Sequence, residues 1–80
     1  MNEIKRRKNE AEFERWIEKA DGSRIYSFEI KGRMGWKALY LKEVDSEEKT
    51  LKFWQEVYDE KNVLREIHEK HPIDKGHKKL

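Results

Sequence analysis

The spacing of hydrophobic residues changes along the chain, and the first spacing is helical. Four apolar residues recur at the i, i+3, i+4, i+7 positions that lie on one face of a helix: Phe13, Trp16, Ile17 and Ala20. Asn9, with Glu12 three residues later, suits a helix start, and Gly22 suits a left-handed end. We therefore predict an amphipathic helix over residues 9–21, preceded by a separate basic segment at 1–8.

The spacing then becomes a strict alternation. Residues 24–31 alternate apolar and polar side chains, which is typical of a strand with one apolar face. Two glycines bracket a tight turn at Arg33–Met34, and residues 36–44 continue as a second strand. This part of the chain predicts a β-hairpin.

Residues 46–70 fit two different structures. Six of their side chains fit a helical stripe: Phe53, Trp54, Val57, Leu64, Ile67 and His68. The run "DEKN" interrupts that stripe with four polar residues, and it is also typical of a hairpin loop, in which Asp59 opens the turn and Asn62 tolerates a left-handed conformation. A weak repeat with an offset of 13 residues, from Glu43 to Glu56 and onward, favours two strands. We favour the strands and keep the helix as the alternative.

These elements predict an α+β fold in one domain, residues 1–80: an N-terminal helix packed on a four-stranded antiparallel β-meander at 24–70. Loops of two, five and three residues would set the register of that meander. The helix-covered face would then carry Tyr26, Phe28, Ile30, Leu39, Leu41, Leu51, Phe53, Val57, Val63 and Ile67. The opposite face would carry Trp36, Tyr40, Trp54, Tyr58, Leu64 and His68, with Lys31, Lys42 and Lys52 among them.

Composition limits the size of the core and the class of protein. The chain is 45% charged and 35% hydrophobic, and its three Trp, three Tyr and three Phe supply most of the area that it can bury. Without cysteine it forms no disulfide or zinc-thiolate site. No apolar run approaches the ~20 residues of a membrane span, so we expect a cytoplasmic protein that does not bind membranes. Abundant Lys and Glu also resemble the composition of thermophile proteins.

Charge is distributed unevenly along the chain. Four of the first eight residues are basic, and the tail at 71–80 adds Lys75, Lys78 and Lys79, whereas residues 9–74 are net acidic. Such ends are usually solvated, but they also suit contact with phosphate groups or with another chain.

The predicted aromatic–basic face is the first candidate site. We expect Trp36, Tyr40, Trp54 and Tyr58, with Lys42 and Lys52, to lie together on it. Bases of single-stranded RNA stack on such rings while lysines contact the phosphates. An aromatic patch on a small domain is equally typical of a homodimer interface or of a site for a partner protein. All of these interpretations stay open.

The histidines form the second candidate site. His68, His71 and His77 follow one another at a loose spacing near the C-terminus, with Glu66 and Asp74 nearby. They are either ordinary surface residues, or acid–base groups for RNA cleavage, or metal ligands if the C-terminal segment folds back. The sequence does not decide whether the protein is an enzyme, and we assign no metal or other cofactor.

Two stretches of the chain, "GRMGWKALYLKEVDSEEKTLKFW" and "EIHEKHPIDKGHKK", resemble the C-terminal half of TumE-type proteins, small toxins of prokaryotic toxin–antitoxin pairs. In this resemblance Tyr40 matches the strand tyrosine of the family, and Asp45 matches its hairpin. Phe53 and Trp54 match the aromatic residues that follow, and Pro72 with His77 matches the closing segment. The Arg-Tyr-Asp-Asn run and the histidine pairs of the family are missing here. The resemblance implies a cytosolic protein that acts on RNA and binds an antitoxin protein.

Overall fold

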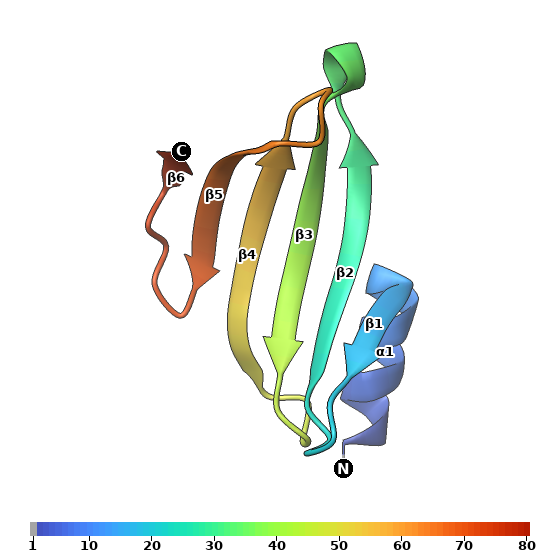
Figure 1. Cartoon of the computed structure of the whole chain (residues 1–80). Helices are drawn as coiled ribbons and strands as arrows, with labels where there is room; N and C mark the ends of the chain where they lie inside the picture. Colours follow the sequence, from blue (N-terminus) through green and yellow to red (C-terminus); the bar gives the residue numbers. More distant parts are fainter. Residues whose placement is uncertain (1) are drawn as a thin grey trace.

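The computed structural model describes residues 2–80, which form one helix and one antiparallel sheet (Figure 1). The sheet has six strands in the order β1-β2-β3-β4-β5-β6, so each strand pairs with its neighbour in the sequence. The elements are α1 (Glu3–Phe13), β1 (Arg15–Glu18), β2 (Arg24–Lys31), the 3-10 turn η1 (Arg33–Gly35), β3 (Lys37–Val44), β4 (Thr50–Tyr58), β5 (Leu64–His71) and β6 (His77–Lys79). The predicted α+β class is confirmed, but the sheet has six strands where we predicted four.

The helix lies earlier in the chain than the predicted span of 9–21. It ends at Phe13, and Glu14 has a φ of 69°, the left-handed conformation that closes many helices. Asn2 caps the start, because its side-chain oxygen accepts a hydrogen bond from the backbone N–H of Lys5 at 3.1 Å. Residues 3–8 of the predicted basic segment are therefore part of α1, and residue 1 lies outside the described residues.

Trp16 and Ile17, which their spacing placed on the predicted helix, lie in β1 instead. β1 pairs with β2 along its whole length, and the Trp16 ring lies 6.0 Å from the ring of Tyr26. These contacts join residues that are distant in the sequence. The spacing of apolar residues along the chain does not report such distant contacts. The predicted helix was therefore wrong beyond Phe13.

Residues 46–70 form strands and no helix, as we favoured. Asn62 has the left-handed φ expected of it, 65°, and the Asp59 carboxylate accepts two backbone N–H bonds within its loop. Asp45 and Glu48 occupy the same positions in the loop before it, and Glu48 also has a φ of 65°. The two hairpin loops therefore share one geometry, but they lie 14 residues apart, so the repeat of 13 residues in the sequence does not align them.

The β2–β3 loop is one residue longer than predicted, and this changes which side chains share a face. The backbone N–H of Gly32 bonds to the carbonyl of Trp36, which leaves three residues in the turn, with Met34 and Gly35 at positive φ. Phe28 therefore lies opposite Tyr40. Because side chains alternate, a shift of one residue exchanges the two faces of β3.

Register shifts inside the later strands complete the rearrangement. The β3–β4 and β4–β5 hairpins begin as predicted, with Val44 opposite Thr50 and Tyr58 opposite Leu64. Irregularities then shift the pairs that follow, at Glu43/Val44, Phe53/Trp54 and Val57/Tyr58. The helix-side face then carries Trp16, Tyr26, Phe28, Ile30, Ala38, Tyr40, Lys42, Phe53, Gln55, Val57, Glu66 and His68. The other side, called here the open face, carries Ile17, Ile25, Leu39, Leu41, Lys52, Trp54, Glu56, Tyr58, Leu64, Ile67 and Glu69 among others.

The core lies between α1 and the helix-side face and is thin. Phe13, Tyr26 and Val44 are its fully buried apolar residues, and Phe28 and Phe53 pack against them. Figure 1 shows α1 against the β1–β2 edge, with β3 to β6 extending away from it. The helix therefore covers only part of one face of the sheet.

A buried polar cluster holds α1 to the sheet beside this core. The Glu48 carboxylate accepts hydrogen bonds from Arg6 at 2.8 Å, from Asn9 at 3.0 Å and from the Tyr26 hydroxyl at 2.8 Å. Arg24 adds a bond to the same hydroxyl at 3.2 Å. The buried residues of α1 are thus Arg6, Asn9 and Phe13, a largely polar set that gives no hydrophobic period in the sequence.

Candidate functional site

The structure does not bring together the predicted aromatic–basic face. Tyr40 and Lys42 lie on the helix-side face, whereas Lys52, Trp54 and Tyr58 lie on the open face. Trp36 lies in the β2–β3 connection, where it lines a shallow hollow with Arg33 and Met34. The predicted grouping is wrong because the register shift between Glu43 and Val44 pairs Leu41, and not Tyr40, with Trp54.

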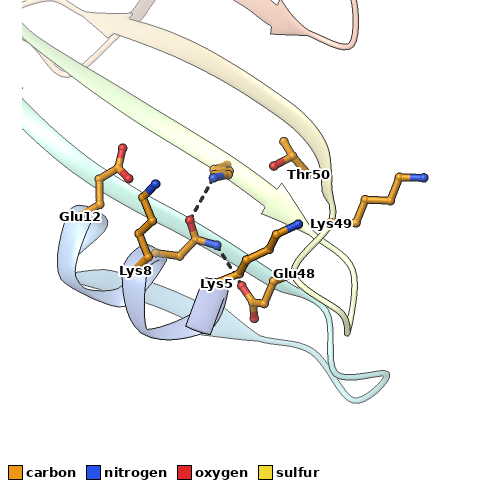
Figure 2. A pocket seen from close by; sticks show the side chains of 8 residues that line it. Lys5, Lys8, Glu12, Glu48, Lys49 and Thr50 are labelled. Atoms are coloured by element: carbon orange, nitrogen blue, oxygen red, sulfur yellow. Dashed lines mark hydrogen bonds between the residues drawn. The ribbon is translucent and has the colours of Figure 1, made fainter. Parts of the chain in front are cut away.

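A basic cleft lies instead between α1 and the β3–β4 loop (Figure 2). It has a volume of about 270 Å³ and is lined by Lys5, Lys8, Asn9, Glu12, Lys42, Glu48, Lys49 and Thr50. Figure 2 shows Lys5 projecting from the helix toward the loop beside Glu48, whereas Lys8 extends beside Glu12. The carboxylate of Glu48 is engaged by Arg6, Asn9 and Tyr26, so the charge of the cleft comes from four lysines against the one carboxylate of Glu12.

A more apolar hollow adjoins the basic cleft. It shares Glu12, Lys42 and Thr50 with the cleft and adds Phe13, Phe53 and His71. Next to it, the ammonium of Lys70 lies 5.0 Å from the ring centre of Tyr40 and 5.7 Å from that of Phe53. The cleft and the hollow, with Tyr40 and Lys70, are called here the helix-side groove. Of the predicted site residues, the groove contains Tyr40, Lys42 and His71.

A histidine pair lies on the same face, farther from α1. β6 pairs with β5 so that His77 lies opposite His68, and the centres of the two imidazole rings are 4.4 Å apart. One continuous row across the strands runs Phe28, Tyr40, Gln55, His68 and His77. The predicted tail at 71–80 therefore folds back as a strand, and the row joins the groove to the histidines.

Each histidine of the pair contacts a carboxylate. His68 Nε2 lies 2.6 Å from Asp74 Oδ1, and His77 Nδ1 lies 3.4 Å from Glu66 Oε1. The pKa of Asp74 is lowered by the backbone N–H of Gly76 and by His68, so Asp74 is ionised at neutral pH.

The two imidazoles differ in access. The side chain of His68 is 15% exposed, and its Nδ1 is buried with no hydrogen-bond partner among the described atoms. The side chain of His77 is 47% exposed. Since Glu66 faces Nδ1 of His77, the Nε2 atom is the one available to a ligand. Of the three candidate histidines, the structure pairs His68 with His77 and places His71 in the groove opposite Phe53.

The residues that the sequence failed to assign to a site are Lys5, Lys8, Lys49, Gln55 and Lys70. Lys5 and Lys8 are three apart, a spacing that places side chains on one face of a helix. The sequence signal for that face was the capping residue Asn2, followed by Glu3 in the first turn. Gln55 and Lys70 had no such signal, because their neighbours follow from the strand register.

Across residues 2–80, no three histidine, aspartate or glutamate side chains gather as ligands for a metal ion. The described chain also has no helix with the length and hydrophobicity needed to cross a membrane. Comparison with protein-family models, with characterised proteins and with solved structures gives no match. The resemblance to TumE-type toxins and the cytoplasmic location stay predictions from the sequence.

Proposed function

We propose that this chain is a small RNA-binding module that holds a single-stranded segment in the helix-side groove. The observation that carries this proposal is the continuity of the groove: lysines from α1, β3 and the β3–β4 loop lead directly to Tyr40, Phe53 and His71. Lysines at such a site contact phosphates, and exposed rings stack on bases.

Charge supports this face over the open face. On the open face, Glu56 accepts hydrogen bonds from the Trp54 indole at 2.9 Å and from the Tyr58 hydroxyl at 2.7 Å. Glu69 lies opposite Trp54 on the neighbouring strand. A phosphate backbone laid over these rings would meet carboxylates interleaved with Lys37 and Lys52, which lie over the Tyr58 and Trp54 rings. The helix-side groove instead gathers Lys5, Lys8, Lys42, Lys49 and Lys70 beside a single exposed carboxylate, that of Glu12.

The test measures the binding of a fluorescent single-stranded RNA over a range of salt concentrations. Replacing Lys5 and Lys8 by Gln removes two phosphate contacts, so the slope of log K against log salt should fall by about 1.4. The matched control replaces Lys31 and Lys61, both exposed and outside the groove, by Gln. An equal loss in the two double variants would show attraction by net charge alone and would contradict a groove.

The histidine pair favours a second candidate function, cleavage of the bound RNA. Nε2 of His77, with Nδ1 facing Glu66, would accept the proton of a 2′-hydroxyl. The 2′-oxygen then bonds to the adjacent phosphorus, the bond from phosphorus to the 5′-oxygen breaks, and that oxygen takes a proton from water. The products are a 2′,3′-cyclic phosphate and a free 5′-hydroxyl.

His77→Ala should then slow cleavage by roughly 10²–10⁴-fold while RNA binding persists. The control is Lys61→Gln, because Lys61 is exposed in the β4–β5 loop, outside the groove and apart from the histidine pair. Cleavage by His77→Ala at the wild-type rate, or cleavage of an all-deoxy strand, would rule out this chemistry.

A further inference from the structure

The open face carries eight apolar side chains that the described chain leaves without a second layer; Ile17 is 70% exposed, and the other seven are partly exposed. Its apolar side chains come from the five strands β1 to β5: Ile17, Ile25, Leu39, Leu41, Trp54, Tyr58, Leu64 and Ile67. The helix α1 packs on the opposite side of the sheet. There Arg6 bonds to Glu48, Asn9 accepts a bond from Lys42, and the Phe13 ring contacts the Tyr26 ring. Stable domains bury such a face against another layer.

The exposed area of the chain indicates how much surface a second layer would cover. A folded monomer of 9.8 kDa is expected to expose about 5,200 Å². This chain exposes 5880 Å². The excess, about 700 Å², is close to the ~800 Å² that each partner contributes to a standard protein interface.

The shape of the molecule agrees with this comparison. The radius of gyration is 13.6 Å, whereas a compact domain of 80 residues has about 11.6 Å. The molecule measures 40 × 24 × 21 Å, so one sheet extends well beyond the helix that covers it. A second layer on the open face would make the assembly compact.

Charge identifies the kind of partner. The open face carries five basic positions and four acidic ones: Arg15, Lys31, Lys37, Lys52 and Lys78, with Glu29, Glu43, Glu56 and Glu69. Several are already paired within the face, such as Lys37 with Glu29 at 3.7 Å and Lys52 with Glu69 at 3.9 Å. A nearly neutral surface with both signs interleaved is complementary to a second copy of itself and unsuited to a polyanion.

We propose that two copies of this chain pack open face to open face, as a sandwich of two sheets. Sheets packed in this way lie about 10 Å apart, with their inner side chains interdigitated. Leu41 and Trp54 lie opposite each other on the central strands and form the middle of the interface. Both helix-side grooves face outward from this dimer, so the proposal does not depend on RNA binding.

Sedimentation equilibrium of the full chain tests the proposal. The wild type should have a mass of about 20 kDa, twice the 9.8 kDa of one chain. Trp54→Glu places a charge in the interface and should reduce the mass to that of a monomer. Gln55→Glu adds the same charge one residue along, on the opposite face, and should stay dimeric.

A wild type that sediments as a monomer at about 100 μM would overturn the proposal, because interfaces of standard size have dissociation constants in the micromolar range or below. A folded Trp54→Glu variant that stays dimeric would also overturn it, because the copies would then pair through strand edges.

A second measurement avoids dependence on the folding of Trp54→Glu. The chain has no cysteine, so Leu39→Cys introduces a single thiol on the open face. Its rate of reaction with a thiol reagent should fall as protein concentration rises, because the dimer covers it. The thiol of Gln55→Cys, on the helix-side face, should react at a constant rate. A Leu39→Cys rate independent of concentration would contradict the interface.

Discussion

At the scale of single residues, Glu48 is the centre of the contacts between α1 and the sheet. It is 2% exposed and accepts hydrogen bonds from Arg6, Asn9 and Tyr26. Burial by itself raises the pKa of Glu48, but these three hydrogen bonds outweigh it, so the pKa is lower than the ordinary value of 4.5. The ionised carboxylate therefore stabilises the folded state.

Glu48→Ala should destabilise the fold by about 3–5 kcal/mol, because it leaves the buried guanidinium of Arg6 with only the more distant carboxylate of Glu18, at 3.7 Å, and removes the acceptor for Asn9 and Tyr26. Urea unfolding at pH 7 measures this loss. Glu60→Ala, in the exposed β4–β5 loop, is the control and should have little effect.

The same contact gives a pH dependence. The pKa of Glu48 is lower in the folded state than in the unfolded chain. The stability that its ionised carboxylate contributes is therefore complete when the pH is above the unfolded pKa, and it is lost as the pH falls through the folded pKa. The difference in stability between wild type and Glu48→Ala should therefore shrink below about pH 4.5. A difference that stayed constant to pH 2 would show that packing, and not charge, carries the effect.

Gly35 is the second residue with a specific structural requirement. It has a φ of +81°, and a Cβ added to it would lie 3.0 Å from the Cβ of Glu60 in the adjacent loop. Gly76 also has a positive φ, +68°, but a Cβ there meets no atom within 4 Å.

Both Gly35→Ala and Gly76→Ala should cost about 1–2 kcal/mol for the left-handed backbone. Gly35→Ala should cost more, because Glu60 must also move. Thermal unfolding of the two variants compares them directly. Equal losses would mean that the β4–β5 loop adapts freely.

At the scale of elements, α1 presents two of the groove lysines, and its first turn depends on Asn2. The Asn2 side chain satisfies the Lys5 N–H, one of the donors that a helix start leaves unpaired. Asn2→Ala should therefore cost about 1 kcal/mol, whereas Asn2→Asp should keep the cap.

Urea unfolding followed by circular dichroism measures this cost. If the groove binds RNA, Asn2→Ala should also weaken binding, since Lys5 lies in the first turn. Full binding by a variant with a frayed first turn would place the RNA elsewhere on the protein.

At the scale of the whole molecule, a single sheet with a small core predicts that stability depends on association. If the dimer forms, only the folded state is bound by the partner copy, so raising the protein concentration stabilises it. The thermal midpoint should therefore rise between 5 μM and 500 μM, roughly a hundredfold range. Trp54→Glu should show a lower midpoint that does not depend on concentration. A constant midpoint for the wild type would indicate a stable monomer.

Local patterns in the sequence determined much of this protein. The alternation over residues 24–31 predicted β2, and Asp59 with Asn62 predicted the third hairpin loop, because both signals arise within a few residues. The absence of cysteine and the need to bury nine aromatic rings likewise follow from composition alone.

Only the tertiary structure decided which side chains meet. One additional residue in the β2–β3 turn exchanged the faces of Tyr40 and Leu41, and the pairing of β6 with β5 brought His77 to His68. The position of α1 depends on Glu48, a contact 42 residues from Arg6 in the sequence. Such contacts depend on loop geometry and long-range pairing, which a local pattern of hydrophobic and polar residues does not encode.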